Sequence, residues 1–220
     1  MIYIDNGISR IRKLHQDTLS LDIRKTSISR FLSLQAQTLL EAHSSGNTAV
    51  VFHFACWCQS LISQSEAKIM STVIDLKMAR QTIAAEYGFT GWDMIEKLEE
   101  TGFDAAFEQC VDCMLKGDID DLNLRLTEHP ALAQQRSQFG HRATLLHYIA
   151  ANGVESHRQV TPYSASEITQ CLFDHGADAD AIANIYGGSN TMQLLLSSAH
   201  PSNAGVTEAV ARVLNLYSKK

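Results

Sequence analysis

The 220-residue sequence predicts an all-α protein, built as an α-solenoid of helix–turn–helix units. Apolar residues recur about every 3.6 positions through most of the chain, which is the spacing of an amphipathic helix. Glycine, asparagine and proline interrupt this pattern, so that the helices of the second half are short and paired. No alternating apolar and polar run between turn signals is long enough to predict a sheet.

The composition is that of a folded protein, since 45% of the residues are hydrophobic and only three are proline. The net charge of −6 and the lack of any run of Lys or Arg argue against a nucleic-acid partner. No stretch approaches the roughly 18 apolar residues of a membrane span. The N-terminus lacks the basic-then-apolar order of a signal peptide. We therefore expect a cytoplasmic protein with no membrane partner.

The five cysteines do not form the even, well-spaced set of a disulfide framework. Cys110-x-x-Cys113 could be half of a redox or metal site. However, it lies in a helical pattern and no second such pair follows. Burial as small apolar side chains is the simpler interpretation.

Residues 1–101 are expected to form a helical region that caps the solenoid. Ser27 is a suitable N-cap, because its hydroxyl can accept a hydrogen bond from the first helical turn. Gly88 suits the left-handed position after a helix, and Thr90 and Asp93 have the spacing of a capping box. The expected helices of this region cover residues 8–18, 28–44, 48–62 and 69–87, with a further one from Thr90 to about residue 100.

Residues 102–220 form the second expected region. Asp118 caps one of its helices and Pro130 ends it. Lys219 and Lys220 would lie favourably near the carbonyl end of the last helix. The expected helices cover residues 103–115, 119–128, 143–152, 164–174, 191–198 and 206–217.

An internal repeat is the strongest pattern of this second region. Residues 144–153, TLLHYIAANG, match the run that opens an ankyrin repeat, with Leu145 in place of the usual proline. Residues 176–181, GADADA, match the end of such a repeat. We expect Thr144 to cap the first helix and His147 to bond neighbouring backbone. The flanking units are weaker, so the sequence predicts two to three irregular ankyrin repeats.

The chain also resembles a group of bacterial ankyrin-repeat proteins with a helical N-terminal region. That region carries the signature A-R-E-Y-G-F-x-S-W, and residues 84–92 read AAEYGFTGW here. The resemblance covers about residues 76–218 and includes the segments HRATLLHYIAANGVE and EITQCLFDHGADADA. It implies the ankyrin fold and an interaction role, and it gives no indication of any chemistry.

Two segments, residues 154–163 and 199–204, occupy the same place in successive units and are expected to be loops. Insertions in repeat proteins collect on one face, often the binding face. We therefore expect a polar pocket or partner contact there, while the connectors between units lie at the other end. The candidate binding residues are Glu155, His157, Arg158, Tyr163 and His200 of the paired loops, and His141, Arg142 and Tyr186 of the connectors.

The expected function is non-catalytic recognition of another protein. The alternative is a small-ligand-binding or metal-dependent enzyme with its site at the paired loops. The sequence has no H-E-x-x-H, G-x-S-x-G or P-loop motif. We therefore assign no catalytic residue, cofactor or metal ligand.

Overall fold

The computed structural model describes residues 1–218 and is mostly helical, which confirms the all-α prediction. Lys219 and Lys220, expected beside the last helix, lie outside the described residues. The sequence did not predict the small antiparallel sheet of β1 (Ile2–Tyr3) and β2 (Thr161–Pro162). Within residues 1–218, no helix has the length and apolar character needed to cross a membrane.

The chain divides into two compact units. The N-terminal unit comprises residues 6–103. The C-terminal unit comprises residues 1–5 and the chain from Asp104 onward. The first five residues belong to the C-terminal unit because β1 pairs with β2.

The N-terminal unit is organised around its longest helix, which packs against α6, and α6 in turn packs against α4. Ser27 caps this long helix by accepting a hydrogen bond from the Arg30 amide at 3.3 Å, as expected. The elements are α1 (Asn6–Leu14), α2 (Gln16–Leu19), η1 (Ile23–Lys25), α3 (Ile28–Ser44), η2 (Thr48–Val50), α4 (Val51–Trp57), α5 (Glu66–Ser71), α6 (Leu76–Glu86) and α7 (Trp92–Glu96).

Three helix predictions for this unit need correction. The helix expected over residues 69–87 is two helices, because the Asp75 carboxylate accepts from the Met78 amide and starts α6 anew. The helix expected over residues 48–62 ends at Trp57, where the backbone becomes extended. Thr90 is not an N-cap, since Gly91 holds that position.

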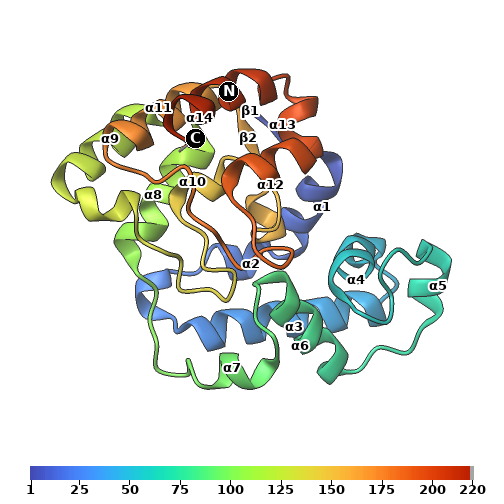
Figure 1. Ribbon diagram of the computed structural model, residues 1–220. Helices are drawn as coiled ribbons and strands as arrows, with labels where there is room; N and C mark the ends of the chain where they lie inside the picture. Colours follow the sequence, from blue (N-terminus) through green and yellow to red (C-terminus); the bar gives the residue numbers. More distant parts are fainter. Residues whose placement is uncertain (219–220) are drawn as a thin grey trace. The chain divides into compact units, whose positions relative to one another are not determined.

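The C-terminal unit contains two rows of helices (Figure 1). In one row α10 contacts both α8 and α12, and in the other α11 contacts both α9 and α14. Each helix of one row also packs on a helix of the other, which gives three layers: α8 with α9, α10 with α11, and α12 with α14. The elements after β1 are α8 (Ala105–Lys116), α9 (Ile119–Glu128), η3 (Pro130–Ala133), α10 (Leu145–Tyr148), η4 (Ser156–Arg158), β2, α11 (Ala165–Asp174), α12 (Thr191–Ser197), α13 (Ala199–Asn203) and α14 (Thr207–Tyr217).

Two segments of this unit differ from the sequence prediction. Residues 199–204, expected as a loop, are largely the helix α13; Pro201 fits in its first turn, where no backbone N–H is needed. The helix expected over residues 143–152 is only the four residues of α10. From Ile149 to Ala151 each amide donates to the carbonyl three residues earlier, and the backbone then turns left-handed at Ala151.

The two connectors before α10 and α12 fold into equivalent hairpins. The Ser137 amide donates to the Ala143 carbonyl at 2.7 Å, and 46 residues later the Ala183 amide donates to the Ser189 carbonyl at 3.0 Å. We call residues 136–144 the first hairpin and residues 182–190 the second hairpin.

The same repeat continues into the helices that follow the hairpins. The Thr144 amide donates to His147 Nδ1 at 3.1 Å, and the Asn190 amide donates to Gln193 Oε1 at 3.0 Å. Gln193 therefore replaces His147 in the last layer, where the sequence shows no T-P-L-H motif.

Candidate functional site

The segment over residues 154–163 folds into a closed ionic network instead of an open loop. Arg158 donates to Glu155 at 3.3 Å and also to Glu108 of α8. The Tyr148 hydroxyl of α10 donates to the same Glu155 carboxylate at 3.2 Å. All four side chains are largely buried. One guanidinium thus ties the segment to α8 and, through Glu155, to α10.

Burial raises the pKa of both carboxyls, and neighbouring charges decide the result at each. At Glu155, Arg158 and His141 outweigh burial, so the pKa falls to about 2. At Glu108, burial outweighs Arg158, so the pKa lies above its usual range. Burial lowers the pKa of Arg158, but the two carboxylates raise it by more. The Glu155–Arg158 pair is therefore ionised at neutral pH.

His141 lies behind this network and is fully buried. Its Nδ1 accepts from the Ala143 amide at 3.1 Å, so a neutral ring carries its proton on Nε2. That Nε2 lies 3.6 Å from Glu155 Oε2, beyond hydrogen-bond distance. Neither of these two atoms has a hydrogen-bond partner in the part of the chain that the structure describes. His141 and Glu155 were expected in an open pocket or connector, and the structure places both in the interior.

The other paired-loop candidates lie beside the first residues of the chain. The Tyr163 amide donates to the carbonyl of residue 1 at 3.1 Å, next to the β1–β2 pair. Burial lowers the pKa of His200 in α13, and the negative charge of Asp5 opposes that effect. Tyr163 is exposed, whereas His157 and His200 are half-buried. Residues 1–5 thus lie near both segments that the sequence paired as open loops.

The connector candidates that remain at the surface are Arg142 of the first hairpin and Tyr186 of the second. Both are exposed, Tyr186 to 66%. Both have left-handed backbones, with φ of 53° and 50°, a conformation that glycine adopts at less cost. The Tyr186 hydroxyl donates to Asn152 Oδ1 at 3.0 Å, which holds the ring near the end of α10.

His147 acts within the fold, as its motif predicts. Its Nδ1 accepts from the Thr144 amide at 3.1 Å, so its Nε2 carries the proton and donates to the Ala181 carbonyl at 3.0 Å. Burial lowers its pKa to about 4. The neutral ring therefore joins α10 to the segment before the second hairpin.

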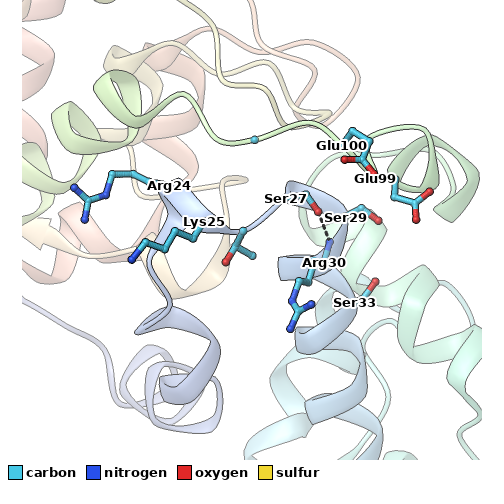
Figure 2. A pocket seen from close by; sticks show the side chains of 10 residues that line it. Arg24, Lys25, Ser27, Ser29, Arg30, Ser33, Glu99 and Glu100 are labelled. Atoms are coloured by element: carbon cyan, nitrogen blue, oxygen red, sulfur yellow. Dashed lines mark hydrogen bonds between the residues drawn. The ribbon is translucent and has the colours of Figure 1, made fainter.

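A wide groove of about 740 Å³ opens on the N-terminal unit at the start of α3 (Figure 2). Arg24 and Lys25 extend to one side in Figure 2 and pair with Asp22 at 2.8 and 3.5 Å. Arg30 lies along α3, while two glutamates lie on the other side. The cations do not converge, so the groove lacks the geometry of an anion site. Its lining residues are Arg24, Lys25, Thr26, Ser27, Ser29, Arg30, Ser33, Glu99, Glu100 and Gly102.

A second groove of about 610 Å³ lies between the end of α4 and one face of α6. Trp57, Met78 and Phe89 supply its apolar surface, and Asp75 and Lys77 are among its polar residues. No motif in the sequence points to a site here, because these residues come from the end of α4, from α6 and from the non-helical segment after α6.

The N-terminal unit also contains a buried chain of hydrogen bonds. His53 Nδ1 lies 2.8 Å from Glu86 Oε2, and His53 Nε2 lies 3.2 Å from His15 Nε2. These residues come from α4, α6 and the start of α2, so the chain links three helices. Its members lie 33 and 38 positions apart in sequence, a spacing that no motif detects.

The cysteine pair of α8 behaves as structural thiols. Burial raises the pKa of Cys110 and Cys113 to about 11, and the Cys113 thiol donates to Asp121 at 2.9 Å. A thiol protonated at neutral pH is a poor nucleophile and a poor metal ligand. Across residues 1–218, no three His, Cys, Asp or Glu side chains are grouped to hold a metal ion.

No protein-family model, no curated protein and no solved structure matches this chain. The geometry of the chain's own residues therefore carries the functional argument.

Proposed function

We propose that the C-terminal unit is an ankyrin-type recognition module that binds another protein through its hairpin tips. The helix layers would be two to three irregular ankyrin repeats, and the N-terminal helices would cap that solenoid. The binding surface would centre on Arg142 and Tyr186, and the protein would act without catalysis in the cytoplasm.

The observation that carries the proposal is the repeated hairpin with strained, exposed residues. Arg142 and Tyr186 keep left-handed backbones that cost of order 1 kcal/mol each, although glycine would avoid this cost. A residue that strains the fold and has an exposed side chain is a candidate for selection by function. The buried Arg158 network has no comparable exposed side chain.

The chemistry of the surface suggests what it binds. Tyr186 offers a large ring with a polar end, the second hairpin also exposes Ile182, and Arg142 brings a cation. Tyrosine and arginine are enriched among residues that dominate protein interfaces. The matching partner surface would combine an apolar pocket with a carboxylate.

Capture from the native cell tests this proposal. The full chain would be immobilised as wild type, as the Arg142→Ala/Tyr186→Ala double variant and as Tyr163→Ala. Tyr163 is a matched control, because it is a tyrosine with 50% exposure that lies outside the hairpins. Quantitative mass spectrometry should find a protein retained by wild type and Tyr163→Ala and depleted at least about tenfold by the double variant.

The opposite pattern would reject the hairpin surface. If Tyr163→Ala loses the captured protein and the double variant retains it, the binding site lies on the segment over residues 154–163 instead. Circular dichroism of each variant would establish that the fold is intact.

A further inference from the structure

The N-terminal unit contains a pair of buried histidines that joins its first two helices to α4. His53 lies on α4 and has no accessible surface, and His15, at the junction of α1 and α2, is 2% exposed. The two rings meet edge to face, with their centroids 5.1 Å apart and their Nε2 atoms 3.2 Å apart. The contact between α1–α2 and α4 therefore includes two groups that can each bind a proton.

The geometry limits the number of protons that the closed pair can hold. A hydrogen bond between the two Nε2 atoms needs one nitrogen that donates and one that accepts. A second proton would point the two N–H groups at each other. On the far side of the ring, His53 Nδ1 lies 2.8 Å from Glu86 Oε2 and can donate to that carboxylate. The closed pair therefore keeps one Nε2 without a proton, whichever histidine it belongs to.

Charge imposes the same limit. Glu86 of α6 is buried, and its carboxylate can balance one imidazolium at His53. Two imidazolium rings would leave a net positive charge in a site that has almost no contact with water. An unbalanced charge is costly to bury, so the closed pair disfavours the second proton for electrostatic as well as geometric reasons.

The other ionisable side chains on the helices around the pair lie elsewhere. On α1, α2, α3, α5 and α6 they are exposed, except Glu86, His43, which bonds to a backbone carbonyl, and Arg80, which lies over the ring of Trp92. On α4 the Cys56 thiol is exposed, and partial burial and the charge of Glu86 raise its pKa. Glu86 is therefore the charged group that faces the pair.

Acid favours an opened form of this contact. In an opened or unfolded chain each imidazole takes up a proton at about pH 6.5. The closed pair holds at least one proton fewer, so each pH unit below about 6 favours opening by about tenfold. Opening would separate α1 from η2, which leads directly into α4, and would uncover the buried Ile8 and Ile11 of α1.

We propose that the His15–His53 pair is a pH-sensitive switch that holds α1 and α2 on α4 near neutral pH and releases them in mild acid. Glu86 positions the ring of His53 and balances the one charge that the closed pair can carry. The switch lies within the N-terminal unit, so it can fail without the hairpin surface, and the hairpin surface can fail without it.

Hydrogen exchange of the full chain between pH 7 and pH 5, corrected for the intrinsic exchange rates, tests the proposal. Protection of the α1 amides should fall by about tenfold for each pH unit below about 6. Comparison with the α8 amides of the C-terminal unit separates this local opening from unfolding of the whole chain. Protection of α1 that does not change with pH would overturn the switch.

Two variants assign the effect to the pair. The His15→Gln side chain can still bond to His53 Nε2 and does not titrate, so protection of α1 should become nearly independent of pH. His43→Gln is the control, because His43 is a histidine of the same unit that bonds to the Ile69 carbonyl at 3.1 Å, and it should keep the wild-type dependence. The wild-type dependence in His15→Gln would contradict the proposal.

A measurement on the wild type alone keeps the proposal testable if His15→Gln fails to fold. Nitrogen NMR spectra of the histidine rings at pH 7 should show one Nε2 of the pair with a proton and the other without. Two protonated Nε2 atoms at pH 7 in the folded protein would contradict the proton count and overturn the switch.

Discussion

The segment over residues 154–163 and the second hairpin over residues 182–190 are both polar connections between helices in the sequence. In the structure they differ. The first is tied inward by Arg158, which two carboxylates of the interior neutralise. The second turns Tyr186 outward on a left-handed backbone. Polar composition alone therefore does not show which connector exposes its side chains, because a charged side chain with a buried partner of opposite charge can itself be buried.

The largest expected effect comes from removing the central cation. Arg158→Met keeps much of the apolar stem and leaves Glu155 and Glu108 without their counter-charge. We expect a loss of about 3–5 kcal/mol in the free energy of unfolding, measured with urea. Arg125→Met is the control, because its pair with Asp121 is about one-third exposed and should contribute less than about 1 kcal/mol.

A triple variant would sharpen this result. Glu108→Gln, Glu155→Gln and Arg158→Met together remove all three charges, so much of the lost stability should return. No loss of stability in Arg158→Met would show that the network is not a structural tie.

The next effect concerns the close approach of the second hairpin to the end of α10. A Cβ atom on Gly153 would meet Ile185 Cγ2 well inside contact distance, and φ there is 71°. Gly153→Ala should therefore cost about 3 kcal/mol, combining overpacking with a left-handed alanine. At Gly187, with φ of 86°, an added Cβ meets nothing within 4 Å. Gly187→Ala should cost only about 1 kcal/mol in the same urea experiment, and equal costs would contradict the close approach.

A smaller effect is expected from pH. Burial holds the pKa of His147 near 4 in the folded protein, against 6.5 in the unfolded chain. Below pH 6.5 the unfolded chain binds more protons, so the stability from neutral His147 falls between pH 6.5 and pH 4. The loss should reach about 2–3 kcal/mol at pH 4.5.

The chain itself offers the matched substitution for this test. Gln193 makes the equivalent bond in the last layer and does not titrate. The free energy of unfolding of His147→Gln should therefore change less than that of wild type between pH 7 and pH 4.5. The pKa of Glu155 is about 2, so that carboxylate loses its contribution only at lower pH. Identical pH profiles of the two proteins would assign the change to other groups.

The smallest effect should have the opposite sign. Arg142→Gly and Tyr186→Gly each relieve a left-handed non-glycine residue, although glycine also loosens the unfolded chain. We expect a thermal midpoint that is unchanged or raised by a degree or two, corresponding to roughly 0.5 kcal/mol. A marked drop in the thermal midpoint would show that these side chains stabilise the fold, so that their left-handed backbones would no longer indicate a binding role.

The sequence predicted the helices of the C-terminal unit well, because apolar spacing and capping residues act locally. Asp118 caps α9 and Gly176 is left-handed, as their types suggest. The Arg158 network could not be predicted in full, since its partner Glu108 lies 50 positions away. An acidic residue on the apolar face of α8 was a usable signal, because a buried carboxylate requires a partner.

The N-terminal unit shows the other limit of sequence reasoning. Its helix breaks depend on competing local bonds, such as the one that Asp75 makes to the Met78 amide. Its buried His15–His53–Glu86 chain depends on packing between helices, which has no local pattern. The same holds for residues 1–5, which join the C-terminal unit through a two-residue strand.

The central claim is that the hairpin tips, and not the segment over residues 154–163, recognise a partner. The most direct test is titration calorimetry of a captured partner against wild type, Tyr186→Ala and Tyr163→Ala. The account predicts at least about tenfold weaker binding for Tyr186→Ala and unchanged binding for Tyr163→Ala. Unchanged binding for Tyr186→Ala with weakened binding for Tyr163→Ala would contradict it.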